Sequence, residues 1–209
     1  YRNLAYVEQT IEGFQSKGCS GTGFNLANAG EETHKGIEFD ALFAVSDSLV
    51  LGLSGIAIDP VYDSFVNGTC DTTGLAEERY RCAPGESTVD LSGFQPAGVH
   101  ELAFNANAVY SFNLKNGTEG FFRIEYVHEK DVNIADLIPI SLASRGTDNV
   151  NASLGLSSAN GGWDAMIWGR NLTDHKSLIS AFPTTASPGS FSGYPNAPRT
   201  YGLTLRKNF

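Results

Sequence analysis

The sequence predicts an all-β protein: an antiparallel, transmembrane β-barrel segment of about eight strands, with short turns at one end and long loops at the other. Three observations lead to this prediction. Apolar and polar residues alternate along many stretches of the chain. The connections between those stretches alternate between short and long. Charged residues make up only 18% of the chain, below the roughly 25% that is usual in soluble domains.

The strands are predicted from period-two alternation, because residues i and i+2 of a strand lie on the same face. The clearest case has Leu102, Phe104, Tyr110 and Phe112 on one parity, with asparagine and serine prominent on the other. Both parities are apolar in 49–58 and 163–172, so the facing of those two strands is left open. The eight strands are expected at about 2–15, 34–46, 48–60, 99–114, 120–130, 147–158, 162–174 and 198–209.

The connections between these strands alternate in length. Residues 46–48, 115–120 and 159–162 have the Gly, Asn and Asp content of tight hairpin turns. The other connections are long and irregular, at about 16–33, 61–98, 131–146 and 175–197. Outer-membrane barrels have short periplasmic turns and long extracellular loops, and their strands are apolar toward lipid and polar toward the lumen.

Aromatic residues gather near the predicted tight turns, as they do in the interfacial girdles of such barrels. The residues concerned are Tyr110, Phe112, Phe121, Phe122, Trp163 and Phe209. The last strand keeps its alternation to the end of the chain, through Tyr201, Leu203, Leu205 and Phe209. An unpaired strand edge in lipid costs several kcal/mol for each orphaned backbone group, so this strand is expected to be paired along its length.

Composition excludes several functional classes. The 23 acidic and 14 basic residues give a net charge of −9 without any basic cluster, so nucleic acid is not expected as a partner. No catalytic motif is present, so we expect no enzyme activity and no cofactor. The four histidines are scattered and Asp59, Asp63, Glu77 and Glu78 lack the spacing of a calcium loop, so no metal site is expected. There is no apolar run long enough for a membrane-spanning helix.

Three cysteines leave an odd count. Cys70 and Cys82 would close a small loop in a Gly- and Thr-rich segment, and a disulfide there would indicate an oxidising compartment. A pairing of Cys19 with either of the other two remains the alternative.

Three segments, taken in order, resemble TonB-dependent outer-membrane receptors. "NAGEETHKGIE", starting at Asn28, resembles the N-A-G-x-x-x-x-x-G-x-E stretch of that family. "WGRNLTDHKSL", starting at Trp168, resembles its W-x-x-N-L-x-D segment, and "PNAPRTYGLTLRKNF" resembles its final strand with the terminal aromatic residue. Barrels of this class have about 22 strands and a plugged lumen. The resemblance therefore implies that residues 1–209 are the C-terminal portion of the barrel, without the plug domain and the N-terminal strands.

The resemblance also implies a function, a location and partners. The parent protein would be an active transporter in the outer membrane of a Gram-negative bacterium, taking up a scarce nutrient, most often a ferric chelate (siderophore). TonB and its inner-membrane energy complex would drive it through the missing N-terminal part. Gly202, Leu205 and Phe209 match the C-terminal signal read by the barrel-assembly machinery, whereas Lys207 departs from it, because an aromatic residue is usual there.

Candidate ligand contacts lie in the long loops. Arg79 and Arg81, with Tyr80 between them, could hold an anionic nutrient, because arginine presents a planar fork to carboxylates. Aromatic residues of the last long loop could stack on a ring of the ligand: Phe182, Phe191 and Tyr194. Asn171 and Asp174 are expected instead to hold the end of a strand by side-chain hydrogen bonds, although Asn171 also begins an N-x-T sequon.

Two other readings remain open. One is a complete, small, eight-stranded outer-membrane protein with a structural or adhesive role, in which the first strand would pair with the last. The other is a secreted, glycan-binding β-sandwich. The chain has neither an initiator Met nor a recognisable signal peptide at its start, which favours a piece of a longer protein.

Overall fold

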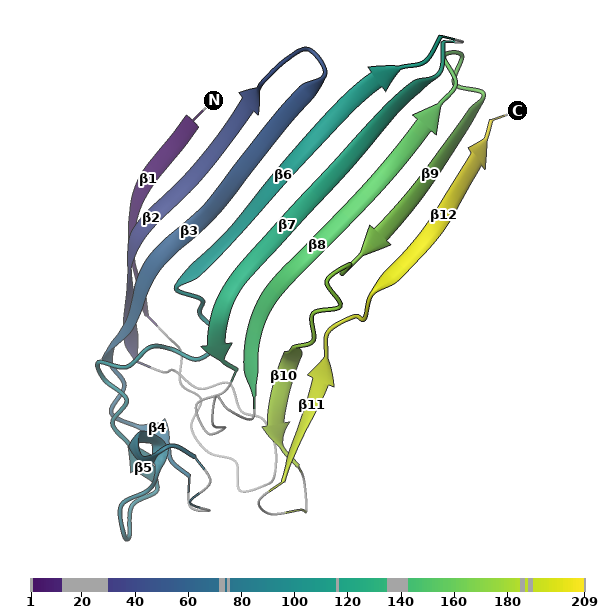
Figure 1. Ribbon diagram of the computed structural model, residues 1–209. Coiled ribbons are helices and arrows are strands. Elements are labelled where there is room, and N and C mark those ends of the chain that lie inside the picture. Colours follow the sequence, from purple (N-terminus) through teal and green to yellow (C-terminus); the bar gives the residue numbers. More distant parts are fainter. Residues whose placement is uncertain are drawn as a thin grey trace.

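The strands of the chain form one large, curved, antiparallel sheet (Figure 1). The computed structural model describes residues 2–12 by their backbone, and residues 30–71, 74, 76–115, 117–134, 143–184, 187 and 190–208. The sheet has eight strands in the order β1-β2-β3-β6-β7-β8-β9-β12, and each strand is antiparallel to its neighbours. The described part of the chain contains no helix long and apolar enough to cross a membrane.

All eight predicted strands are present. Their bounds are β1 (Arg2–Glu12), β2 (Glu31–Ala44), β3 (Leu49–Ser64), β6 (Leu102–Asn113), β7 (Glu119–Asn133), β8 (Ser144–Ser157), β9 (Trp163–Arg170) and β12 (Thr200–Lys207). β3 continues past its predicted end, through Pro60, which pairs with His34 of β2. The amide of Ile58 points to the β6 side, where it donates to Glu101, so the nitrogen of Pro60 points the same way. The hydrogen-bond ladder between β3 and β6 ends before Pro60, so the missing N–H of proline removes no hydrogen bond from it.

Short and long connections lie at opposite ends of the sheet, as predicted (Figure 1). At what we call the turn end, hydrogen bonds close each predicted hairpin, from Leu49 N to Ser46 O (3.3 Å), Gly117 N to Leu114 O (3.0 Å) and Gly161 N to Ser158 O (2.9 Å). Gly117 and Gly161 have φ of 77° and 69°, which glycine adopts without steric cost. The opposite end, the loop end, carries the long segments.

Two of the loops predicted to be irregular contain ordered elements. The segment after β3 forms the short pair β4 (Gly68–Thr69) and β5 (Thr88–Val89) and a 3-10 helix, η1 (Glu78–Tyr80). The segment after β9 forms a hairpin of β10 (Leu178–Pro183) and β11 (Phe191–Pro195). These elements are short, from two to six residues, so alternation alone does not separate them from loop.

The register decides the facing of every strand, because directly opposite residues share a face. Leu51 and Leu53 of β3 lie opposite Ala108 and Ala106 of β6, so the odd residues of β3 are on the apolar side. Ile167 of β9 lies between Leu154 and Leu203, so the odd residues of β9 are on that side too. The predicted apolar parities of the other described strands also fall on this one face.

The sheet has no hydrophobic core on either side in the described part of the chain. The buried hydrophobic residues are instead Tyr62, Cys70, Ala76, Tyr80, Leu91, Val132 and Ala143, all near the loop end. A soluble protein of this size would bury one face of such a sheet against a second layer. No second layer packs on this sheet among the described residues, so that part of the chain does not form a β-sandwich.

Candidate functional site

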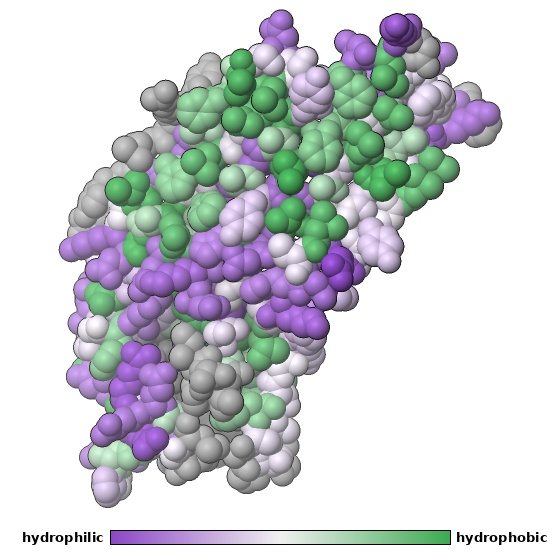
Figure 2. Space-filling model, in the orientation of Figure 1, coloured by the Kyte–Doolittle hydropathy of each residue, from purple (hydrophilic) through white to green (hydrophobic). Residues whose placement is uncertain are grey.

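One face of the sheet is an exposed apolar surface, which we call the apolar face. Figure 2 shows its hydrophobic area over the part of the sheet nearer the turn end. On the last strand, Leu203 and Leu205 are 63% and 70% exposed, and neighbouring Ile167 is 61% exposed. An apolar surface of this extent marks an interaction with lipid or with protein. Its residues come from seven strands and include Ile37, Phe43, Leu51, Leu53, Tyr110, Phe122, Ile124, Leu154, Ile167, Tyr201, Leu203 and Leu205.

A belt of polar and charged residues borders the apolar face toward the loop end (Figure 2). His128 Nδ1 lies 2.9 Å from Asp148 Oδ1, and the hydroxyl of Tyr126 donates to the same oxygen over 2.7 Å. Lys130 forms an ion pair with Glu101. The apolar face and this charged belt therefore share a boundary that runs across the strands. Membrane proteins have such a boundary where they pass from the hydrocarbon layer to the headgroups.

The other face of the sheet carries amides, hydroxyls and charges, and we call it the polar face. A hydrogen-bonded row crosses β6, β7 and β8 on it. Asn105 Nδ2 donates to Glu125 Oε1 over 2.8 Å, and Asn151 Nδ2 donates to Glu125 Oε2 over 3.1 Å. Asn107 joins the row through Asn105, and the backbone amide of Asn171 donates to Asn151 Oδ1 over 3.0 Å. This face is built to contact water or a polar partner.

A hollow on the polar face lies between strands β7 and β12, and we call it the β7–β12 groove. Its volume is about 550 Å³, within the usual range of ligand pockets. The side chains that line it include Arg123, Glu125, Met166, Trp168, Arg170 and Thr204. Trp168 Nε1 donates to Thr204 Oγ1 over 3.2 Å, and the guanidinium of Arg170 lies over the Trp168 ring at 5.4 Å from its centroid.

These groove residues were missed in the sequence. Arg123 and Glu125 alternate with Phe122 and Ile124, so their place on a polar face could be read from parity. Trp168 could not, because β9 is apolar on both parities and only its pairing with β8 and β12 reveals which face it occupies.

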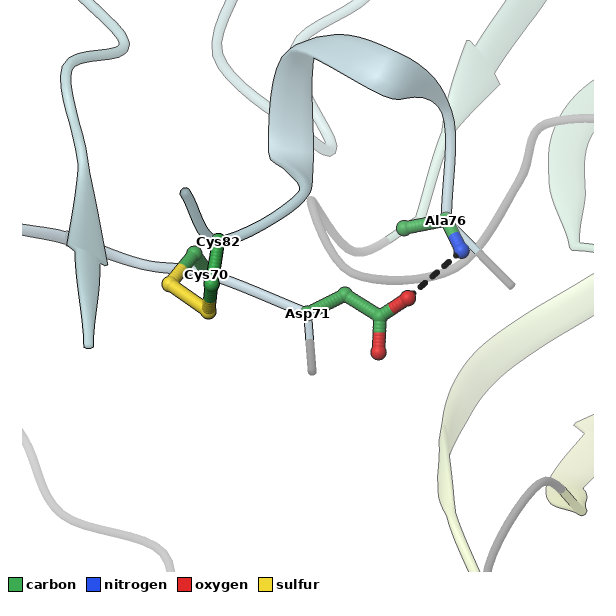
Figure 3. Close-up of a disulfide and its surroundings, with 4 residues drawn as sticks. All are labelled: Cys70, Asp71, Ala76 and Cys82. Carbon is green, nitrogen blue, oxygen red and sulfur yellow. Dashed lines mark hydrogen bonds between the residues drawn. A yellow bond between two sulfur atoms is a disulfide. The ribbon is translucent and has the colours of Figure 1, made fainter. Parts of the chain in front are cut away.

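The end of β3 and the loop after it form a small unit with its own core, described at residues 62–71, 74 and 76–94, which we call the loop unit. Tyr62, Ala76, Tyr80 and Leu91 form a buried cluster, against which Phe65, Val89 and Phe94 pack. Cys70 and Cys82 are joined by a disulfide (Figure 3). Cys19, the alternative partner, lies outside the described residues.

Side-chain hydrogen bonds at the disulfide hold the loop unit together. The carboxylate of Asp71, next to Cys70, accepts from the backbone amide of Ala76 over 2.9 Å (Figure 3). Arg81, next to Cys82, donates through Nε to the carbonyl of Ala76 over 2.9 Å. Further along, the hydroxyl and amide of Ser92 both bond Asp90 and lower the pKa of its carboxyl, while Ser92 Oγ accepts from the amide of Phe65 over 2.9 Å.

The structure gives the predicted ligand residues of this loop largely structural contacts. The side chain of Tyr80 is only 2% exposed, so it belongs to the loop core and has almost no accessible surface, and its contact with a ligand stays an untested prediction. Arg79 lies over the rings of Tyr80 and Phe94 and pairs with Glu77 at 3.1 Å. Ligand contact through the exposed residues Arg79 and Arg81 stays a prediction.

The three predicted aromatic residues of the last loop lie on the β10–β11 hairpin but do not form one cluster. Phe182 and Tyr194 are neighbours, with ring centroids 5.9 Å apart, and Tyr194 is 63% exposed. Phe191 lies opposite Pro183, on the other face of the hairpin. Figure 1 shows this hairpin and the loop unit at opposite sides of the loop end, so the two predicted groups of ligand residues are not brought together.

Asn171 holds the junction where the hairpin leaves the sheet, as predicted. Its Nδ2 donates to the carbonyls of His175 and Ala197 over 3.0 and 2.9 Å, and its Oδ1 accepts from the amide of His175 over 2.9 Å. Asn171 is 3% exposed and has φ of 49°. Asp174 Oδ1 accepts from the amide of Arg199 over 3.3 Å. The side-chain amide of Asn171 is therefore buried and hydrogen-bonded, and it is not accessible for glycosylation at this sequon.

Two of the three predicted assembly-signal residues lie in β12. Gly202 is on the polar face, where an added Cβ would come within 2.6 Å of the Trp168 ring. Leu205 is on the apolar face, opposite Ala165. Phe209 lies outside the described residues. Asn208 ties the end of β12 to the turn after β8, since its amide donates to Gly162 O over 3.1 Å and its side chain to Gly161 O over 2.7 Å.

Comparison with known proteins supports the fold. No protein-family model and no curated protein matches the sequence. Among solved structures, the chain is similar to the ferric yersiniabactin uptake receptor FyuA from Yersinia pestis, with a TM-score of 0.67 and 15% sequence identity. The match covers 100% of this chain and 27% of that receptor. The chain therefore has the fold of an antiparallel β-barrel segment, one that spans about a quarter of the length of the receptor it matches.

Proposed function

We propose that this chain is the C-terminal part of the barrel of a TonB-dependent receptor in the outer membrane of a Gram-negative bacterium, and that the whole protein takes up a scarce nutrient, most often a ferric chelate. The observation that carries the proposal is the exposed apolar face of an uncovered sheet. The motifs named above and the fold shared with a ferric yersiniabactin uptake receptor support it.

The dimensions of the apolar face fit a membrane. Along β2 and into its turn the odd-numbered apolar residues run from Ile37 to Val45, and Lys35 and Asp59 take over on the same face toward the loop end. That span is nine residues, and a tilted transmembrane strand needs about 9–11 residues to cross the hydrocarbon layer. The turn end would then face the periplasm, and the loop end would face the outside.

In this proposal the chain forms part of the barrel wall, the loops at the loop end and the C-terminal assembly signal, and it catalyses no reaction. The barrel-assembly machinery would insert it, outer-membrane lipid would cover the apolar face, and TonB would act on a part of the protein outside this chain. The Cys70–Cys82 disulfide fits such a location, because the loop end would lie in an oxidising environment.

The two alternatives have less support. A closed eight-stranded barrel needs β1 to pair with β12, but these strands lie at opposite edges of the described sheet. A glycan-binding sandwich needs two facing sheets, and the described strands form one large sheet with two small two-stranded pairs.

The experiment is an uptake assay on the whole protein. Deleting its gene should abolish the uptake of one or more radiolabelled ferric chelates under iron limitation, and a proton uncoupler should abolish it in the parent strain. Uptake that persists in both cases would refute the transport role. A protein recovered as a soluble monomer without detergent would refute the membrane location.

A further inference from the structure

A buried histidine lies where the chain returns from the loop unit to the sheet. His100 is 9% exposed and belongs to residues 95–101, which connect the loop unit to β6 and which we call the return segment. Beside it, the register of β7 shifts between Glu129 and Val132, so β7 has a bulge there. Bulges re-aim groups near the ends of sheets. In this one, the carbonyl of Lys130 lies against the imidazole of His100.

The contacts of the imidazole define a neutral ring. Nδ1 of His100 lies 2.6 Å from the carbonyl oxygen of Lys130, which can only accept, so Nδ1 carries a proton. Nε2 lies 3.3 Å from Nε and 3.2 Å from Nη2 of Arg145, and a guanidinium can only donate, so Nε2 presents its lone pair. His100 is therefore uncharged in this arrangement.

Arg145 connects this ring to the backbone of the return segment. Its Nη2 donates to the carbonyl of Gly98 over 3.1 Å. The amide of Gly98 donates in turn to the carbonyl of Asn133 over 2.7 Å. The return segment is thus attached to β7 and β8 at Gly98, and one of the two bonds comes from an arginine that rests on the neutral ring.

A carboxylate lies close enough to replace Arg145 as the partner of the ring. Glu129 Oε2 is 3.9 Å from Nε2 of His100 and accepts a hydrogen bond from the hydroxyl of Thr147. Protonation would turn Nε2 from an acceptor into a donor, which Arg145 cannot pair with and Glu129 can. Other titratable side chains described at this junction include Lys130 and Glu101, which form an ion pair, Asp131 beside Gly146, and His175, whose Nε2 donates to the carbonyl of Gly146 over 3.1 Å.

We propose that His100 is a proton-operated latch on the loop unit. The neutral ring holds Arg145 on Gly98. A proton taken up from the medium at Nε2 is donated to Glu129 as a hydrogen bond, the imidazolium repels Arg145, and the return segment loses its bond at Gly98. Raising the pH removes the proton and closes the latch again. The latch stands on these contacts alone, whichever nutrient the whole protein takes up.

The test is hydrogen exchange of the whole protein in detergent, followed by mass spectrometry at about pH 7.5 and about pH 5.5, a range in which histidines change charge and carboxylates stay ionised. Rates are corrected for the intrinsic effect of pH. Protection of the return segment should fall about tenfold or more on acidification, because a hydrogen bond from a charged donor is lost.

Variants assign this response to the latch. His100→Gln keeps an acceptor for Arg145 but does not titrate, so its return segment should stay protected at both pH values. Arg145→Gln should leave that segment weakly protected at both. His175→Gln and His128→Gln are the matched controls, since these histidines bond Gly146 and Asp148 instead, and both should keep the response of the parent.

Each result decides the proposal. An acid-induced loss of protection that His100→Gln removes and both controls keep supports it, provided that each variant resists unfolding in cold SDS as the parent does. Equal protection of the parent at the two pH values, or a response that His100→Gln retains or His175→Gln abolishes, overturns it. If Arg145→Gln does not fold, the histidine variants decide the matter without it.

Discussion

Replacing Ile124 by arginine tests which face of the sheet meets lipid. Ile124 is 40% exposed in the middle of the apolar face, between the rows that contain Phe122 and Tyr126. Arginine at the midplane of a barrel's lipid face costs about 2–4 kcal/mol. The loss of the exposed 40% of the isoleucine from lipid adds about 1 kcal/mol. We therefore expect Ile124→Arg to reduce the free energy of unfolding from the bilayer, and so the stability of the barrel, by about 3–5 kcal/mol.

The matched control is Ser111→Arg, on the polar face of the adjacent strand β6. Ser111 lies opposite Phe121 and its side chain is exposed, so arginine there can remain in water and should cost about 0–1 kcal/mol. The assay is urea unfolding of the whole protein in lipid vesicles, followed by tryptophan fluorescence and by resistance to SDS at room temperature. Equal destabilisation by the two variants, or a larger effect of Ser111→Arg, would refute the assignment of the faces.

Three further predictions concern the loop end. Cys70→Ser with Cys82→Ser should make the loop unit much more sensitive to protease, since closing a loop with a sequence separation of 12 is worth about 3 kcal/mol; unchanged cleavage rates would contradict this. Asn171→Ala should speed hydrogen exchange at the hairpin junction, because it leaves buried carbonyls without donors at about 1–3 kcal/mol each; exchange equal to the parent's would show that water replaces the side chain. The pKa of Asp90 is lowered by the hydroxyl and amide of Ser92, so its contribution to stability is present above the ordinary carboxyl pKa, about pH 4, and is lost as the pH falls through the lower folded value. Pepsin cleavage of the loop unit should therefore rise at the acid end of a pH series, and Asp90→Asn should flatten that rise; a slope that the variant leaves unchanged would count against the role of the carboxylate.

The role of glycine beside aromatic residues belongs to tertiary structure. Phe121 of β7 lies over Gly155 of β8, where an added Cβ would come within 2.2 Å of the ring. Trp168 lies over Gly202 in the same way. From the sequence, Gly202 is expected only as part of the assembly signal, and Gly155 has no assigned role. The register shows that they make room for a ring from the neighbouring strand, a device that stabilises twisted sheets.

The predicted ligand residues show the limit of reasoning from residue type. Arg79 and Arg81 flank Tyr80 in an exposed-looking segment, which suggested a recognition loop. The tyrosine is instead the centre of a small core, because the disulfide and Asp71 fold the segment back onto β3. Whether a loop residue faces solvent or its own core depends on contacts between residues far apart along the chain.

The sequence by itself determined the fold class, the number of main strands and their order along the chain, the ends of the sheet at which turns and loops lie, and the apolar parity of most strands. Side-chain alternation and turn chemistry are local properties, so a single strand suffices to read them. Tertiary structure alone decided the facing of β3 and β9, the core of the loop unit, and the meeting of Arg123, Trp168 and Arg170 in one groove. These features depend on the register between paired strands, and register cannot be read from the sequence of one strand alone.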